Sequence, residues 1–274
     1  MVTYVPGTER EFFEAMPLQM YKYRIWSNPH HQKLLSELEL FFPEPKLFND
    51  PYDCGLPFRA DPSDYDPVRI KEKLEALAPK QFPMLKHDPK AMEQEVAKQL
   101  FHIQQDPDTY FQEQYAFEKD HLSSMYGVLS LTPHPANFLM WSHYSDGHKG
   151  FVMGFDTEQL VRQNFGTFAK VTYSEEIPTI SVLNMDIHTM HRLIYTKAKI
   201  WEYEDEHRIT RILSPNTKAI AHHSTFRTVH LGINMTQADR FAIIKIVQEK
   251  YPSINVFEMT LGNKKFELIP SRIY

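Results

Sequence analysis

The chain has 274 residues, of which 42% are hydrophobic and 24% charged, and its formal net charge is −5. This composition is typical of a soluble globular protein, and the negative charge argues against wholesale electrostatic capture of nucleic acid or anionic membrane. The nine glycines form neither a GxGxxG nor a GxxxxGK[ST] motif, so the sequence signatures of Rossmann and P-loop nucleotide sites are missing. A single cysteine excludes CxxC motifs and an intramolecular disulfide.

The N-terminal segment 1–17 is polar, and we expect a loose arm or a short helix there, followed by one α+β domain over 18–274. The segment lacks the basic flank and apolar core of a signal peptide. No apolar run in the chain approaches the ~20 residues that a membrane span needs. A cytoplasmic protein with no membrane partner is therefore expected.

The first sheet-forming half is short. A strand is predicted over 18–24 and a second over 38–42. Between them, Ser27 or Asn28 is a capping residue for a short helix that runs through Glu37, because Pro29 stands just inside its start. An irregular loop is expected from 46 to 55.

Residues 56–122 have a different pattern, which predicts a helical insert. Asp-Pro pairs at 66–67, 88–89 and 106–107 each place a capping carboxylate before a proline, and apolar residues follow each pair at helical spacing. Three helices are therefore expected between the two sheet-forming halves. The insert either completes the hydrophobic core or forms a lid or partner-binding element.

Helices and strands intermix in the rest of the chain. Strands are predicted at 125–132, 151–155, 168–173, within 204–213, and near 226–231, 254–259 and 265–269. Helices are predicted at 136–146, 157–165, 183–199 and 236–250. Because the regular βαβ spacing of a doubly wound sheet is missing, we expect an α+β fold with a central, mostly antiparallel and split β-sheet.

The segment 199–208 is the densest in charged and aromatic residues. If it is extended, Glu202, Glu204 and Glu206 share one face, with Arg208 as a built-in partner. One interpretation is a solvated acidic edge. The other is a site that stabilises a positively charged transition state, since carboxylates beside aromatic residues suit that task.

Three further segments contain candidate site residues. The segment 139–150 contains Trp141, His143, Tyr144 and His148, whose two histidines do not match a common zinc spacing, so no metal is expected. The segment 48–54 is either a structural turn or a loop that presents Asn49, Asp50 or Asp53 into a cleft. The strand end at 21–24 is rich in cations and aromatic residues, and includes Tyr23 and Arg24.

Together these clusters resemble DUF2971, a bacterial family of unknown function. The family pattern has a Tyr-Lys-Tyr-Arg strand, a Phe-Asn-Asp-Pro-(Phe/Tyr)-Asp loop, a Ser-Leu-(Ser/Thr) strand, Met-Trp-Ser-His-Tyr followed by His-Lys-Gly, and Trp-x-Tyr-Glu-x-Glu-x-Arg. Matching residues stand here at 21–24, 48–53, 130–132, 140–150 and 201–208, and the segment 229–232 also fits. The resemblance implies no activity.

The order of the motifs is also similar to the ADP-ribosyltransferase fold, which binds NAD in a split β-sheet without a glycine-rich loop. The arginine-serine-glutamate branch of that fold uses a first-strand Arg, a Ser-x-Ser strand and a Glu-x-Glu pair. Arg24, the segment 130–132 and the segment 204–206 fall in that order. The middle motif here is Ser-Leu-Thr, and the Trp-Ser-His-Tyr segment has no counterpart in that branch.

This second resemblance implies roles for individual residues. Arg24 would bind NAD phosphate or ribose, and Ser130 would hold the nicotinamide ribose. Glu206 would stabilise the oxocarbenium ion while Glu204 orients the acceptor. Tyr23, Trp141 or Tyr144 would stack on nicotinamide. Thr132 and His143 would make further contacts with NAD. The other candidates for the site are Asn49, Asp50, Asp53, His148 and Arg208.

The leading hypothesis is an NAD-consuming ADP-ribosyltransferase or NAD glycohydrolase of a toxin-like or defence type, with NAD as co-substrate and a protein or nucleic acid as acceptor. A rival is a nuclease or RNA-modifying enzyme, with or without a divalent metal, whose site residues would be Asp50, Asp53, His143, Glu204 and Glu206. A third hypothesis is a non-enzymatic sensor whose acidic aromatic cleft binds a ligand while the helical insert contacts a partner.

Overall fold

The computed structural model describes residues 13–54 and 59–274, so most of the predicted N-terminal arm lies outside the described residues. The chain divides into two compact units. The sheet unit comprises Met1–Leu47, Met125–Tyr173 and Lys199–Tyr274, and the helical unit comprises Phe48–Ser124 and Ser174–Ala198. Helices and mostly antiparallel strands intermix along the chain, which confirms the predicted α+β class.

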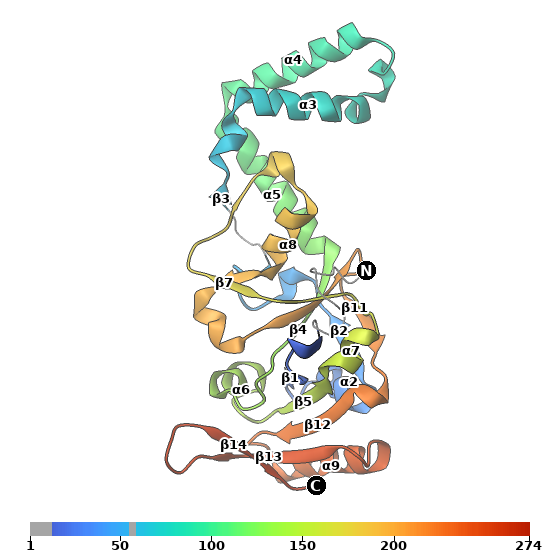
Figure 1. Ribbon diagram of the computed structural model, residues 1–274, viewed down its shortest axis with the longest axis vertical. Helices are drawn as coiled ribbons and strands as arrows, with labels where there is room; N and C mark the ends of the chain where they lie inside the picture. Colours follow the sequence, from blue (N-terminus) through green and yellow to red (C-terminus); the bar gives the residue numbers. More distant parts are fainter. Residues whose placement is uncertain (1–12, 55–58) are drawn as a thin grey trace. The chain divides into compact units, whose positions relative to one another are not determined.

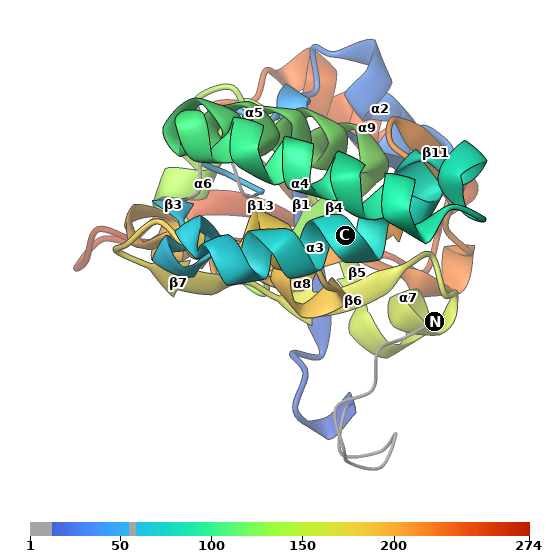
Figure 2. The same cartoon turned by 90° about the horizontal axis from the view of Figure 1, so that it is seen from above.

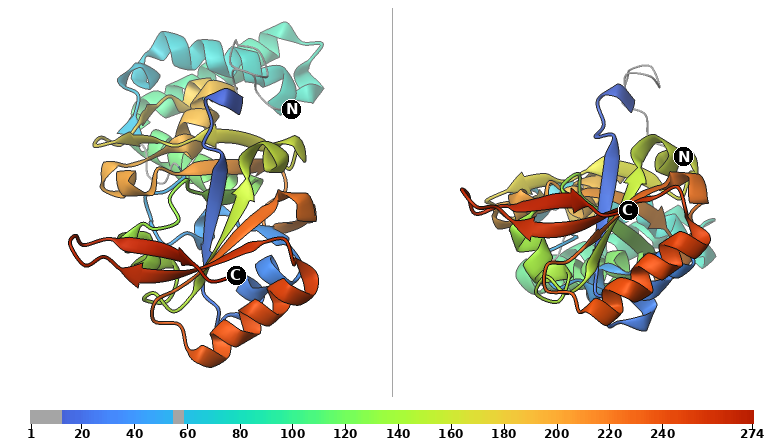
Figure 3. Two further views of the ribbon diagram at one scale, coloured as in Figure 1. Left: turned by 60° about the horizontal axis from the view of Figure 1, so that its bottom comes forward. Right: turned by 90° about the horizontal axis from the view of Figure 1, so that it is seen from below.

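A five-stranded sheet forms one part of the sheet unit. Its strands lie in the order β1 (Gln19–Arg24), β5 (Phe151–Asp156), β12 (Phe226–Leu231), β13 (Asn255–Leu261) and β14 (Leu268–Arg272). Only β12 and β13 are parallel, and such a pair needs a crossover connection, which α9 (Gln237–Lys250) supplies. The helix lies along one face of this sheet (Figure 3), where Ile243 and Val247 join the main hydrophobic core.

Two smaller sheets complete the sheet unit. One has the order β4 (Tyr126–Leu131), β10 (His207–Ile212) and β6 (Thr167–Lys170), and the other pairs β2 (Glu39–Phe42) with β11 (Thr217–Ile220). Alternate side chains point into the core shared with the large sheet, as Leu129, Leu131 and Ile209 do. A single bridge, Tyr21 with Thr132, links β1 to β4.

Short helices connect these strands. They are α2 (Pro29–Ser36), α6 (Phe138–Tyr144) and α7 (Thr157–Arg162), with 3-10 helices η1 (Pro45–Leu47), η5 (Lys199–Glu204) and η6 (His223–Thr225). Each α-helix begins after a capping side chain, and these caps are Asn28, Asn137 and Asp156. The strand β7 (Thr172–Ser174) lies at the boundary between the two units.

The helical unit contains the three predicted helices. They are α3 (Pro67–Gln81), α4 (Pro89–Gln105) and α5 (Pro107–Met125), and α3 and α4 run side by side (Figures 1 and 2). Asp66, Asp88 and Asp106 accept hydrogen bonds from the first turns, as predicted. The unit also contains α8 (Ile187–Tyr195), β3 (Arg59–Ala60), β8 (Thr179–Ile180), β9 (Thr196–Ala198), η2 (Pro62–Tyr65), η3 (Pro83–Leu85) and η4 (Val182–Asn184).

Two predicted elements differ from the observed ones. The helix expected over 183–199 is shorter, because Asp186 caps α8 by accepting a hydrogen bond from Thr189 N at 2.7 Å, and 196–198 is the strand β9. The strand expected over 168–173 is two strands, β6 and β7, with Val171 between them. Within residues 13–54 and 59–274, no helix combines the length and the apolarity that crossing a membrane demands.

Candidate functional site

The strands that carry the Arg, Ser and Glu motifs are neighbours in the sheet unit. Tyr21 and Thr132 exchange two backbone hydrogen bonds, at 2.7 and 3.1 Å, which join β1 to β4 at one point. On the other side of β4, Ser130 lies opposite Arg208 of β10. The structure therefore brings together three strands that lie far apart in the sequence.

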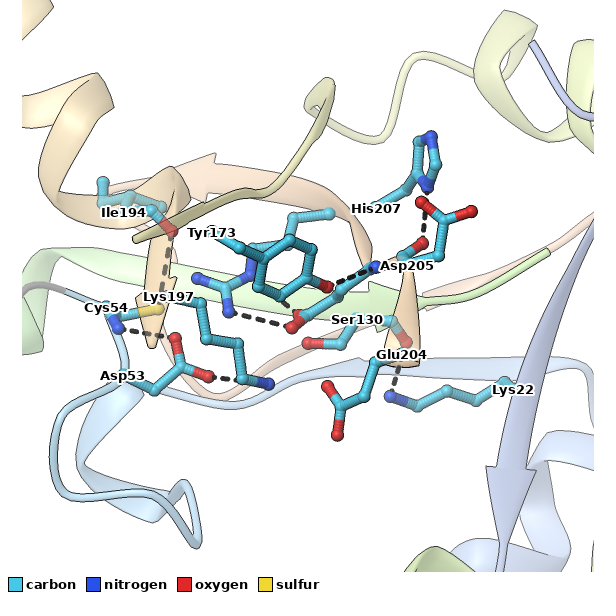
Figure 4. Close-up of polar contacts among 12 residues, drawn as sticks. Lys22, Asp53, Cys54, Ser130, Tyr173, Ile194, Lys197, Glu204, Asp205 and His207 are labelled. Atoms are coloured by element: carbon cyan, nitrogen blue, oxygen red, sulfur yellow. Dashed lines mark hydrogen bonds and ion pairs between the residues drawn. The ribbon is translucent and has the colours of Figure 1, made fainter. Parts of the chain in front are cut away.

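Beyond that single bridge, β1 and β4 no longer pair. Residues 22–24 pair with β5 alone, while residues 129–131 pair with β10 alone. We call this divergence the β1/β4 split. Lys22 Nζ donates a hydrogen bond across it to the backbone oxygen of Ser130 at 2.6 Å (Figure 4). The predicted split sheet is thus present at the strand ends that carry the candidate residues.

Glu206 and Arg208 form a buried ion pair beside Ser130. Since Leu129, Leu131 and Ile209 point into the core, Ser130 and Arg208 project from the opposite face. Arg208 Nε and Nη2 donate to the two carboxylate oxygens of Glu206 at 2.8 and 3.0 Å. The two side chains are 0% and 4% exposed. The geometry is bidentate, so it fixes the orientation of the Glu206 carboxylate.

The backbone around Glu206 is fixed as well. Its N–H donates to the hydroxyl of Tyr173 at 2.7 Å (Figure 4). Its carbonyl oxygen accepts from Val171 N at 2.9 Å. The sequence motifs did not indicate Tyr173, because it lies on β7, which is a separate strand that comes before the acidic segment 199–208.

The segment 199–208 is not extended in its first half, so the condition for a shared face of its three glutamates is not met. Residues Lys199–Glu204 form the 3-10 helix η5, and Asp205 has a left-handed backbone with φ +45°. Glu202 and Glu204 therefore do not alternate with Glu206 along one strand face. The reason is local capping: Asn137 Nδ2 donates to the carbonyl oxygen of Tyr203 at 2.7 Å, and Asp205 N donates to Glu202 O at 3.1 Å.

Glu204 is nevertheless a buried carboxylate of the same region. It is 3% exposed, and its Oε1 accepts a hydrogen bond from the hydroxyl of Tyr144 at 2.6 Å. Tyr144 comes from α6, so the Trp-Ser-His-Tyr segment and the Glu-x-Glu segment meet here. Each of the two predicted glutamates is thus oriented by another side chain: Glu204 by Tyr144, and Glu206 by Arg208.

Arg24 has no counter-ion among the described residues. It is partly buried at the end of β1, and its one hydrogen bond runs from Nη1 to the carbonyl oxygen of Tyr23 at 3.3 Å. Among the described residues, no carboxylate pairs with it. Burial lowers the pKa of the Arg24 guanidinium to about 10. A buried cation without a partner is costly, so this position favours an anionic ligand.

Three of the candidate residues are buried and are not accessible on the surface. Trp141 is 0% exposed and donates from Nε1 to Pro135 O at 2.8 Å, and Tyr23 packs edge-on against it and donates to His134 O at 2.6 Å. Thr132 is buried at the β1–β4 bridge. Neither aromatic ring has an open face for stacking on nicotinamide.

His143 and His148 have different surroundings. His148 is buried, its ring lies parallel to Trp141, and its Nε2 lies 2.9 Å from Ser142 Oγ; burial lowers its pKa. His143 is exposed, and its Nδ1 lies 3.0 Å from the hydroxyl of Tyr203. Its ring packs edge-on against Trp201. His143 is therefore the more accessible of the two histidines.

Asp205 forms a second, less buried network that the sequence motifs did not indicate. Its carboxylate contacts Lys170 Nζ at 2.6 Å and His134 Nε2 at 3.2 Å. Burial acts to raise the pKa of Asp205, but the hydrogen bond and charge of Lys170 lower it below its usual value. This network anchors the left-handed turn that leads from η5 into β10.

The remaining candidates, Asn49, Asp50 and Asp53, belong to the helical unit. Asn49 is exposed, whereas Asp50 is buried and accepts from Tyr52 N at 2.9 Å, as predicted for a tight turn. Asp53 forms a buried ion pair with Lys197 Nζ at 3.3 Å and also accepts from Cys54 N at 2.6 Å (Figure 4). Lys197 was not a candidate, because it stands alone in the sequence.

The side chains offer little support for a metal centre. Among the residues that the structure describes, no group of three or more His, Cys, Asp or Glu side chains has an arrangement that could hold a metal ion. The rival hypothesis of a metal-dependent nuclease therefore lacks a three-ligand group within these residues.

Comparison with known proteins gives one match. No curated protein and no solved structure matches the chain significantly. A family model described as a protein of unknown function, DUF2971, matches residues 140–209. This range includes the Trp-Ser-His-Tyr, His-Lys-Gly and Glu-x-Glu-x-Arg motifs, and it leaves out the Tyr-Lys-Tyr-Arg strand. Over these residues the chain is similar to the DUF2971 family, which carries no assigned activity.

Proposed function

We propose that the chain binds NAD at the β1/β4 split and cleaves the bond between nicotinamide and ribose, as an ADP-ribosyltransferase or an NAD glycohydrolase. The observation that carries the proposal is that β1, which ends at Arg24, meets β4, which carries Ser130, at one bridge, and that β4 pairs with β10, which begins just after Glu206. Residues of these types, in this order, are what the resemblance to the ADP-ribosyltransferase fold implies.

The cation at the end of β1 supports a phosphorylated ligand. Arg24 has no carboxylate partner among the described residues, and its one hydrogen bond goes to the neutral carbonyl oxygen of Tyr23. A guanidinium binds phosphate oxygens in a bidentate manner. The diphosphate of NAD would supply the negative charge that Arg24 lacks in the protein alone.

The two buried glutamates would act on the reacting ribose. As the carbon–nitrogen bond to nicotinamide breaks, its electron pair moves to the pyridinium nitrogen, and the ribose becomes an oxocarbenium ion. Glu206, held by Arg208, would stabilise that positive charge through the ribose hydroxyls. The hydroxyl of water or of an acceptor then forms the new bond to the ribose carbon and releases its proton to a base, a role that we assign to Glu204.

Stacking on nicotinamide would fall to Tyr144. Tyr23 and Trp141 are packed in a core cluster, whereas Tyr144 is partly exposed and is held by Glu204. A partly exposed ring with a fixed hydroxyl suits a stacking role. The toxin-like or defence role, the acceptor and a partner for the helical unit remain parts of the same hypothesis.

The direct test is NAD consumption by the purified full chain. Incubation with NAD labelled in its nicotinamide should release free label, and NAD labelled in adenine should mark an acceptor if the chain is a transferase. Arg24→Gln should reduce turnover at least about tenfold, since it removes a charge-assisted hydrogen bond. Glu202→Gln is the matched control, because Glu202 is an exposed glutamate of the same segment.

Two outcomes would count against the proposal. One is the lack of both NAD binding and nicotinamide release by folded protein. The other is turnover that Arg24→Gln and Glu206→Gln leave at the level of Glu202→Gln. Cleavage of DNA or RNA that a chelator abolishes would instead favour the nuclease hypothesis. Ligand binding without any turnover would favour the sensor hypothesis.

A further inference from the structure

His31 is on the first turn of α2 and contacts the backbone just after the end of β1. Its Nδ1 accepts a hydrogen bond from the backbone N–H of Ile25 at 3.2 Å, so the ring is tied to the residue that follows Arg24. An N–H donor requires a bare nitrogen as acceptor. In the neutral ring the hydrogen is therefore on Nε2, and this nitrogen is a donor.

The groups that act electrostatically on His31 are basic side chains. Arg24 and Lys22 act on it from β1, and His30 acts on it from α2, with no carboxylate among the groups that influence it. Burial and these charges lower the pKa of His31 to about 4. The ring is thus neutral at pH 7 and adds a hydrogen-bond donor to this region without adding to the repulsion between cations.

We propose that Arg24 and His31 together form a diphosphate-binding subsite at the end of β1, in which the Nε2–H group of His31 is a neutral donor. The inference rests on the proposed function, because it assigns the diphosphate of the dinucleotide to these two side chains. The planar, charged guanidinium of Arg24 would donate a pair of hydrogen bonds to one phosphate, and the Nε2–H group of His31 would donate a single hydrogen bond to the other. The positive surroundings favour an anion over any other ligand for both donors.

The test measures binding of inorganic pyrophosphate by titration calorimetry. His31→Asn keeps an acceptor for Ile25 N near the position of Nδ1 but removes the Nε2 donor, and His31→Gln places an amide N–H near Nε2. We expect His31→Asn to weaken binding about tenfold, and His31→Gln to weaken it less than about threefold. Arg24→Gln should weaken it most. The exposed neighbour His30 gives the matched control, His30→Asn, which should bind like the wild type.

Equal affinities of His31→Asn and His30→Asn would overturn the proposal. If His31→Asn does not fold, nitrogen NMR of the wild-type histidine rings decides the question. A bound pyrophosphate must then shift the Nε2 signal of His31, and an unchanged signal refutes the subsite.

Failure of the subsite and failure of the proposed function are distinguishable. Binding of pyrophosphate through His31 without NAD binding or turnover contradicts the proposed function and supports the subsite. NAD turnover with a KM that is the same for His31→Asn and His30→Asn contradicts the subsite alone.

Discussion

Removing one partner of the Glu206–Arg208 ion pair should destabilise the sheet unit strongly. The two side chains are 4% and 0% exposed and make two hydrogen bonds at 2.8 and 3.0 Å, so neither group regains full hydration when the other is replaced. Breaking such a buried pair costs about 3–5 kcal/mol of unfolding free energy. Glu206→Gln and Arg208→Met should each show a loss of this order.

The double variant should be less destabilised than the sum of the two single variants. Replacing both partners removes both charges of the pair together, and such replacements are often close to neutral. Arg162 and Glu158 provide the matched control, because they form an i,i+4 pair at 2.7 Å whose side chains are 50% and 52% exposed. Breaking this surface pair should cost less than about 1 kcal/mol.

Urea unfolding followed by tryptophan fluorescence measures these differences. Trp26, Trp141 and Trp201 are the only tryptophans in the sequence, and all three belong to the sheet unit, so the signal reports on that unit. The reasoning is refuted if Arg208→Met costs no more than Arg162→Met. It is also refuted if the double variant loses the full sum of the two single losses.

Three further predictions concern other parts of the chain. Gly150→Ala should reduce both stability and pyrophosphate affinity, because an added Cβ would collide with the backbone oxygen of Arg24; urea unfolding and calorimetry check this. Burial lowers the pKa of His230 to about 4, so the unfolded chain binds more protons between pH 6.5 and 4, and stability should fall over that window as the pH falls. Urea midpoints at pH 7 and 5 should therefore differ less for His230→Leu than for the wild type. Asp66→Ala removes the cap that accepts from Val68 N at 2.9 Å and should cost about 1 kcal/mol in the helical unit, measured by circular dichroism.

Local signals in the sequence were sufficient for most of the helices. Asp-Pro pairs at 66–67 and 88–89 combine a capping carboxylate with a proline at the first helical position, and both are satisfied within one turn. Asn28 caps α2 for the same reason. Such signals depend on residues a few positions apart, so the sequence alone is enough to read them.

Features that depend on distant partners could not be read in this way. The segment 199–204 becomes a 3-10 helix that Asn137 helps to hold, and no pattern within the segment indicates that contact. The ion pair of Asp53 with Lys197 and the pairing of β11 with β2 likewise join residues far apart in sequence. The candidate site was predictable as a set of motifs, but the partner of each carboxylate was not.

The position of β1 in the sheet has a consequence for synthesis of the chain. Among the described strands β1 comes first in the chain, yet 108 residues separate Lys22 from Ser130 across the split, and β5, its ladder partner among these strands, follows later still. At ~5–20 residues per second, a growing chain leaves this strand edge unpaired for on the order of 10 s. Chaperone binding to nascent chains should therefore concentrate on this N-terminal strand.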